Sequence, residues 1–200
     1  MVELEYAINV EKRWGRERTG DSANVIVARI AAGERQALDI LYQQYAQPLF
    51  GYLMTLTADH GLAEEILQDT FLAAWRGAAH FEGRSSVKTW LFGIARRQAH
   101  NVLRRRNPRF VDDAALELAP SNEPEPEMTA LINADRQAIV TAIERLSPTH
   151  QEVLVLAFVH DLPYAEMAEL LAVPLGTIKS RLSNARRLLR QILESAEMER

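Results

Sequence analysis

The stretch PYAEMAELLAVPLGTIKSRLSNARR, residues 163–187, decides the fold of the C-terminal part of the chain. Its first nine residues have the spacing of a short amphipathic helix. Residues 172–176 interrupt that pattern, and Thr177 then stands where it can cap a second helix. Small Ala168 lies where two helices can cross closely, so the stretch predicts a helix-turn-helix. Three apolar side chains are expected to form the shared core: Leu170, Val173 and Ile178.

The second helix of this motif carries polar and basic residues on a face that we expect to be partly exposed. Arginine and lysine suit phosphates and guanine, asparagine suits adenine, and serine suits either role. Because the second helix of such a motif enters the major groove of DNA, we expect this face to read bases. The expected DNA-binding residues are Gly176, Thr177, Lys179, Ser180, Arg181, Asn184 and Arg187. A small helical bundle with a solvated basic face is the alternative interpretation.

The composition of the 200-residue chain excludes several classes of protein. With 48% hydrophobic and 25% charged residues, it has the composition of a globular protein. No window approaches the ~18 uninterrupted apolar residues of a membrane helix, and the first residues lack the order of a signal peptide. We therefore expect a cytoplasmic protein without membrane insertion. The absence of cysteine and the dispersal of the five histidines predict no metal site and no cofactor.

Charge is distributed unevenly along the chain. The net charge of −4 argues against a protein that coats nucleic acid indiscriminately. Arginines nevertheless gather at residues 96–109, and basic residues gather again at 179–190, with acidic residues between them at 112–127. The proline- and acid-rich run at 120–127 has the composition of a solvated linker.

Helical periodicity and its breaks predict the domain organisation. Apolar residues recur at helical spacing from Val25 to about Arg106, with breaks near Gly33, residues 58–61 and residues 80–83. No segment shows the alternation of a strand. We therefore expect an all-α fold of two small helical domains joined by an acidic, proline-rich linker. The expected parts are a disordered tail at 1–24, a helical domain at 25–107, the linker at 108–130 and the helix-turn-helix domain at 131–195.

The segment from Leu62 to Trp75 is predicted to be an amphipathic helix. Glu65, Gln68 and Asp69 gather on one side of it and form what we call the acidic stripe. The neighbouring Glu64 and Glu65 diverge by about 100° around a helix, so they cannot converge on one reacting atom as a catalytic carboxylate pair would. The expected apolar face consists of Ala63, Ile66, Leu67, Thr70, Phe71 and Ala74.

The loop from Phe81 to Trp90 combines aromatic with polar side chains, a combination that suits an unstacked base of single-stranded DNA. Plain burial of the two rings is the alternative, and for Trp90 it is the one we favour. Ser85 or Ser86 is placed to cap the helix that follows. In that helix the side chains expected to face inward are Leu91, Ile94, Ala95, Gln98 and Val102. Those expected to align on an outer face, which resembles a duplex-contacting surface, are Arg97, His100, Asn101 and Arg104.

Four blocks, in their order along the chain, resemble the bacterial extracytoplasmic-function (ECF) sigma factors, the small two-domain class of RNA polymerase specificity subunits. The blocks are LYQQY at 41–45, AEEILQDTFLAAW at 63–75, TWLFGIAR at 89–96 and VPLGTIKSRL at 173–182. The resemblance covers about Val25 to Leu193.

The resemblance implies a protein without catalytic activity that binds core RNA polymerase and promoter DNA. The acidic stripe would contact the clamp helices of the polymerase's largest subunit, while the flap region and an anti-sigma factor are further implied partners. The 81–90 loop would capture a flipped base of the promoter element near the start site, and the helix at 87–106 would dock on that element's duplex edge. The helix-turn-helix would read the distal element. The residues expected at the proximal element are Phe81, Arg84, Lys88, Trp90, Arg97, His100, Asn101 and Arg104.

The sequence departs from the family pattern in a few places. Arg97 and Asn101 stand where an asparagine and an aspartate are common, and Ala172 stands where the turn usually has glycine. These differences leave the preferred promoter sequence open, and no role is assigned to the tail at 1–24.

Two other functional classes compete with this interpretation. A free-standing helix-turn-helix regulator, binding duplex DNA without polymerase, would usually be a symmetric dimer. The sequence offers no obvious dimerisation helix, and the N-terminal blocks would then have no explanation. A nucleic-acid-processing enzyme would need a metal site or a nucleophile, but the sequence contains neither a P-loop nor a clustered set of carboxylates and histidines.

Overall fold

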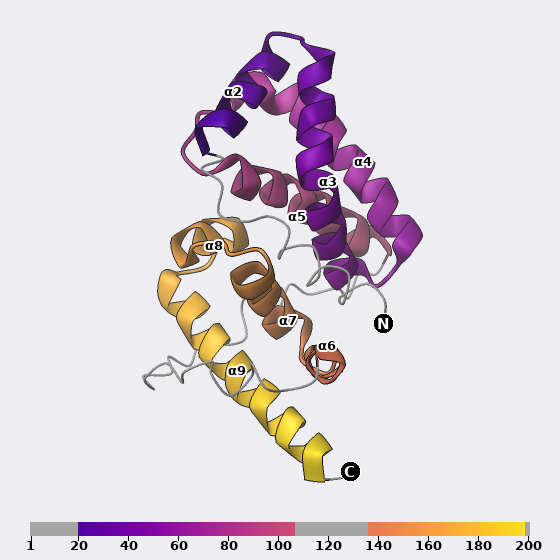
Figure 1. Cartoon of the computed structure of the whole chain (residues 1–200), viewed down its shortest axis with the longest axis vertical. Coiled ribbons are helices and arrows are strands. Elements are labelled where there is room, and N and C mark those ends of the chain that lie inside the picture. The colour runs from indigo at the N-terminus through magenta and orange to yellow at the C-terminus, as the bar shows by residue number, and fades with distance from the viewer. Residues whose placement is uncertain (1–19, 107–135, 199–200) are drawn as a thin grey trace. The chain divides into compact units, whose positions relative to one another are not determined.

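The structure, a computed structural model, describes residues 20–106 and 136–198 of the chain. The chain divides into two compact units, one containing residues 20–106 and the other containing residues 136–198. Both described segments consist of helices joined by short turns, and neither contains a strand (Figure 1). The predicted all-α fold with two helical domains is thereby confirmed.

The N-terminal unit is a bundle in which α3 packs against α2, α4 and α5, while α4 also packs against α5 (Figure 1). Its elements are α2 (Gly20–Ala31), α3 (Arg35–Thr57), α4 (His60–Gly77), the short 3-10 helix η2 (Ala78–His80) and α5 (Val87–Arg106). The rings of Tyr52 and Phe92 meet in its core, with centroids 5.0 Å apart. Other fully buried side chains are Leu41, Leu49, Leu53, Ile66 and Leu91.

Local signals explain where these helices begin and end. Gly33 has a φ of +87°, which a glycine adopts without strain, and it lies in the turn between α2 and α3. Arg29 pairs with Glu34 across that turn, and the hydrogen bond from the guanidinium lowers the pKa of the Glu34 carboxyl. Asp59 caps α4, because its Oδ1 accepts a hydrogen bond from the Leu62 amide at 3.0 Å. The breaks predicted near Gly33, at 58–61 and at 80–83 are therefore confirmed.

The start of α2 corrects the predicted tail. The tail was expected to reach Asn24, but the helix begins at Gly20. The physical reason is an apolar row, in which Ala23, Ile26, Val27 and Ile30 recur at helical spacing and are all buried. Residues 20–24 therefore belong to the bundle, and the remainder of the predicted tail, 1–19, lies outside the described residues.

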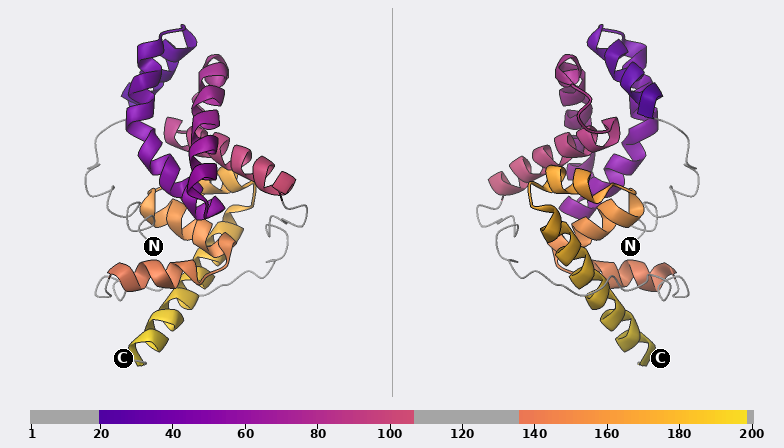
Figure 2. Two further views of the ribbon diagram at one scale, coloured as in Figure 1. Left: turned by 90° about the vertical axis from the view of Figure 1, so that its right-hand side faces the viewer. Right: turned by 90° about the vertical axis from the view of Figure 1, so that its left-hand side faces the viewer.

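In the C-terminal unit the long helix α9 packs along α6, α7 and α8 (Figure 2). The elements are α6 (Arg136–Glu144), α7 (Pro148–Leu154), the π-helix η5 (Val155–Val159), α8 (Tyr164–Leu171) and α9 (Leu175–Met198). Pro148 occupies the first position of α7, and the Ser147 side chain caps that helix. Buried core residues include Val140, Val153, Leu156, Met167, Ile178 and Ala185.

The described residues stop short of the predicted linker. Residues 108–130 lie outside them, so the acidic linker stays a prediction. The helices of the C-terminal unit run from Arg136 to Met198, slightly past the predicted domain end at residue 195. None of the described helices is both long and apolar enough to cross a membrane.

Candidate nucleic-acid and protein interfaces

The helix-turn-helix consists of α8, a short turn and α9. Ala172 ends α8 in the left-handed conformation, with a φ of 54°, a conformation that glycine adopts with less strain. The Pro174 carbonyl then accepts hydrogen bonds from the amides of Thr177 and Ile178, at 2.9 and 3.3 Å. Helix α9 therefore begins at Leu175, two residues earlier than expected. The predicted capping role of Thr177 is wrong, because Thr177 already lies inside the helix.

The core between α8 and α9 differs in part from the prediction. Ile178 is fully buried as expected, but Leu170 and Val173 are only half-buried. The buried apolar residues are instead Met167 and Leu171 on α8 and Leu182 and Ala185 on α9, and the two helices pack against each other. Ala168, expected at a close crossing of the two helices, is half-buried.

The predicted DNA-binding residues of α9 do not all share one exposed face. Gly176, Lys179 and Arg187 are exposed, while Thr177 and Asn184 are half-buried. Ser180 and Arg181 are buried, with only 6% and 3% of their surface exposed. The expectation that these two side chains lie on the exposed face is therefore wrong.

The positions of Ser180 and Arg181 have separate physical explanations. Arg181 follows Ile178 by three residues and precedes Ala185 by four, so all three lie on the buried side of the helix. Its Nε and Nη2 are buried without a hydrogen-bond partner. The Ser180 hydroxyl turns back onto its own helix and donates to the Thr177 carbonyl at 3.0 Å.

Arg186, another member of the basic cluster, holds α8 and α9 together. Its Nη2 donates to the Tyr164 hydroxyl at 3.1 Å, and Tyr164 is the first residue of α8. The same guanidinium lies 4.9 Å from the centre of the Phe158 ring, within the range of a cation–π contact. Arg186 therefore contributes to the packing of the motif, although it belongs to the basic cluster at 179–190.

On α4 the structure separates the apolar face from the acidic stripe as predicted. Ala63, Ile66, Leu67, Thr70, Phe71 and Ala74 are all buried. Glu65, Gln68 and Asp69 are exposed together on the opposite side. Sequence reasoning missed Leu72, which is 50% exposed and lies three residues after Asp69 on the same side of the helix.

The aromatic residues of the predicted base-binding loop contact each other. The rings of Phe81 and Trp90 have centroids 4.8 Å apart, and both are half-buried. The burial expected for Trp90 is therefore only partial, and base capture by the two rings stays a prediction. Ser86 caps α5, because its Oγ accepts from the Thr89 amide at 3.1 Å. Of the two serines proposed as caps, Ser86 is therefore the one that acts.

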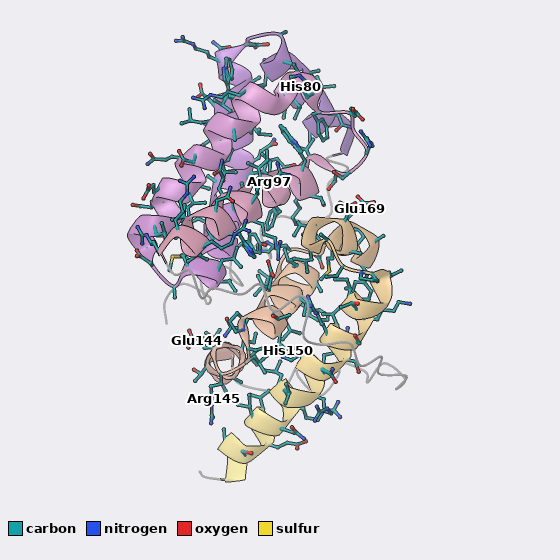
Figure 3. The ribbon with its side chains drawn as sticks, turned by 180° about the vertical axis from the view of Figure 1, so that it is seen from behind. His80, Arg97, Glu144, Arg145, His150 and Glu169 are labelled. Carbon is teal, nitrogen blue, oxygen red and sulfur yellow. The ribbon has the colours of Figure 1, made fainter. Side chains whose placement is uncertain are left out.

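Basic side chains surround this loop and continue along α5. Arg84 is exposed and pairs with Glu82, and Lys88 is half-buried. Arg97 is exposed on α5 (Figure 3). Arg104 is also exposed, and its Nη2 donates to the Oδ1 of half-buried Asn101 at 3.3 Å.

His100 does not join the outer face of α5. Only 8% of its surface is exposed, which contradicts the prediction that it aligns with Arg97 and Arg104. The reason is that α5 packs against α2, α3 and α4, so its buried face is wider than a single apolar stripe. The residues predicted to face inward lie on that buried side: Leu91 and Ala95 are buried, and Ile94, Gln98 and Val102 are half-buried.

The described residues contain no group of three or more histidine, aspartate or glutamate side chains that could hold a metal ion. The candidate surfaces are two exposed faces of the N-terminal unit, on α4 and on the loop with α5, and one exposed face of α9.

Comparisons with known proteins agree with the two units. Residues 41–109 match the model of Sigma-70 region 2, and residues 136–189 match the model of Sigma-70 region 4. The chain is 30% identical to the ECF RNA polymerase sigma factor SigK of Mycobacterium ulcerans (strain Agy99), over 88% of this chain and 96% of that protein. It is 32% identical to the RNA polymerase sigma factor YlaC of Bacillus subtilis (strain 168), over 83% of this chain and 98% of that protein.

A solved structure gives the same result. The sigma factor RpoE, in complex with the anti-sigma factor NepR from Bartonella quintana, is similar with a TM-score of 0.60 and 27% identity, over 78% of this chain and 96% of that one. The two family segments match separate helical units, in the order that the sequence blocks predict. The chain belongs to the ECF family of RNA polymerase sigma factors.

Proposed function

We propose that this sigma factor binds core RNA polymerase through its N-terminal unit and directs it to promoters that both units recognise. The observation that carries the proposal is that region 2 and region 4 match separate helical units, each with an exposed polar face. The protein performs no chemistry of its own. It acts in the cytoplasm, together with the polymerase.

The acidic stripe of α4 is the proposed docking surface for the clamp helices of the largest polymerase subunit. Glu65, Gln68 and Asp69 are exposed on one side of a helix whose opposite side is buried. None of the three is needed to close the core, so their side chains are available to a partner. The polymerase flap region is the proposed partner of the C-terminal unit.

The loop and α5 are proposed to open the proximal promoter element. Arg84, Lys88, Arg97, Asn101 and Arg104 supply cationic and amide groups for the phosphates and base edges of the duplex. A flipped base would stack on Phe81 or Trp90, at about 1–3 kcal/mol per stacked base, and this stacking together with phosphate contacts would offset the few kcal/mol lost on flipping. Because the two rings already contact each other, the base either stacks on an outer ring face or separates the pair.

The exposed side of α9 is proposed to read the distal promoter element. Gly176, Thr177, Lys179, Asn184 and Arg187 retain the DNA-binding role proposed for them, since all are at least partly exposed. An anti-sigma factor is a further proposed partner, because the similar RpoE structure contains the anti-sigma factor NepR.

The test is binding of the purified full chain to core bacterial RNA polymerase, followed by run-off transcription on fragmented genomic DNA of its host. Tight binding with new, specific transcripts is expected. Specific duplex binding by the chain alone, without affinity for core polymerase, would overturn the proposal in favour of a free-standing regulator.

A further inference from the structure

The exposed side of α9 carries a row of four residues spaced four apart. Leu175, Lys179 and Arg187 are exposed, and Ser183 between them is half-buried. At 3.6 residues per turn, successive members of this row are offset by only about 40° around the helix. The row therefore forms one continuous strip, and the strip begins with an apolar side chain.

Leu175 is unusual in its exposure. It keeps 43% of its surface accessible, and among residues 138–196 it is the one large apolar side chain exposed to this degree. Ile178 and Leu182, one and two turns further along α9, are buried and close the core of the motif. The exposed part of the Leu175 side chain is thus accessible to a partner outside the domain.

The position of Leu175 indicates what that contact is. It is the first residue of the second helix of a helix-turn-helix, and the N-terminal residues of that helix are the ones that reach base edges in the major groove. Among the four unmodified bases, only thymine presents a methyl group there. Lys179 is exposed one turn further along α9. Its cation suits a phosphate, while the apolar Leu175 suits a base edge.

We infer that Leu175 contacts the C5-methyl group of a thymine in the distal promoter element and makes the sigma factor selective for thymine at that position. The inference rests on the proposed function of α9 and adds a specificity-determining residue to it. The strip also places Ser183, which the sequence analysis missed, where the buried Ser180 was expected.

The test uses holoenzyme assembled from the full chain and core polymerase. The preferred distal element is first selected from duplexes randomised upstream of a fixed proximal element. Each thymine of the selected element is then replaced singly by deoxyuridine, which removes the methyl group and nothing else. Binding is compared for the native chain, Leu175→Ala, the apolar replacement Leu175→Met, and the control Val25→Ala, which truncates a residue that is 58% exposed on α2.

With the native chain, one deoxyuridine substitution is expected to weaken binding about fourfold, the effect of one buried methyl group. Leu175→Ala should be insensitive to that substitution, whereas Leu175→Met and Val25→Ala should keep the sensitivity. Thermal unfolding of each variant checks that the C-terminal unit is intact.

Two results would overturn the inference while leaving the proposed function standing. One is a selected element in which no thymine methyl matters, and the other is a methyl effect that persists in Leu175→Ala. If the holoenzyme selects no distal sequence at all, the proposed reading by α9 fails, and the assignment of Leu175 fails with it.

Discussion

Helices α4 and α9 both carry charged residues, but the sequence pattern predicts the exposed face of α4 correctly and that of α9 only in part. On α4 every residue of the acidic stripe is exposed, and every residue of the predicted apolar face is buried. On α9 the charged Arg181 lies at a buried position, between Ile178 and Ala185 on the same side. The comparison teaches that position relative to the core decides exposure, even for a charged side chain.

Reversing charge on the acidic stripe should have the largest effect. Glu65→Lys combined with Asp69→Lys should weaken binding to core polymerase at least about 100-fold, about 3 kcal/mol, because both carboxylates of the proposed contact would be replaced by cations. Both residues are exposed, so the urea midpoint should not change. The matched control is Glu144→Lys with Glu194→Lys, which makes the same change in net charge on exposed residues of the other unit. Equal loss in both double variants would refute a specific docking surface on α4.

Arg181→Ala tests the buried position on α9. Loss of the buried stem should lower the free energy of unfolding of the C-terminal unit by about 2 kcal/mol, at about 0.8 kcal/mol for each methylene removed from the core. Arg181→Met, which keeps most of the volume, should restore stability and distal-element binding. The measurement is urea unfolding monitored by circular dichroism. An Arg181→Ala variant of native stability that loses DNA discrimination would instead return Arg181 to the set of base readers.

Lys179→Ala should show the opposite behaviour on the same helix. Lys179 is exposed, so its removal should leave stability within about 0.5 kcal/mol of the native value. Holoenzyme binding to the distal element should fall by about 1.5 kcal/mol, within the range of a single base contact. Competition binding on the selected element and on scrambled duplex measures both affinities. A loss of the same size on scrambled duplex would assign Lys179 to phosphate.

The smallest expected effect is a difference in stability between variants at the start of α4 and at the start of α9. Asp59→Ala removes the side-chain cap of α4 and should cost about 1 kcal/mol of stability. Thr177→Ala should cost less than about 0.5 kcal/mol, because Thr177 lies inside α9 and its backbone amide, which donates to the Pro174 carbonyl, is kept. Arg106→Ala is the control for the ion pair between Arg106 and Asp59, whose atoms are 3.6 Å apart. A larger loss for Thr177→Ala than for Asp59→Ala would contradict the observed helix start.

Much of the fold could be predicted from the sequence, because apolar spacing reports the centre of a buried face. The helix breaks, the buried face of α4 and a serine cap at residue 85 or 86 all follow from local pattern, while the structure identifies the cap as Ser86. The width of a buried face does not, because it depends on how many neighbours a helix has. That is why His100, on a helix with three packing partners, was wrongly expected on the surface.

The site residues were harder to predict, for two physical reasons. An arginine has an apolar stem as well as a charge, so Arg181 can fill a buried position although its residue type suggests exposure. Exposed apolar residues such as Leu72 and Leu175 give no signal in a pattern that assigns apolar residues to the core. Once the start of α9 is known, a spacing of four residues on either side of Lys179 predicts that Leu175 and Ser183 share its side of the helix.

The burial of Arg181 and the contacts of Arg186 also set how strongly salt should weaken the binding of the C-terminal unit to DNA. Five cations fall within residues 179–190, and if each neutralised a phosphate, the logarithm of affinity would fall with that of salt concentration with a slope of about −4.5. Arg181 is buried, and Arg186 is held by Tyr164 and Phe158. With Lys179, Arg187 and Arg190 left to release counterions, the slope should be no steeper than about −2.7. Affinity for the distal element should therefore fall less with rising salt concentration than it would if all five cations bound phosphates.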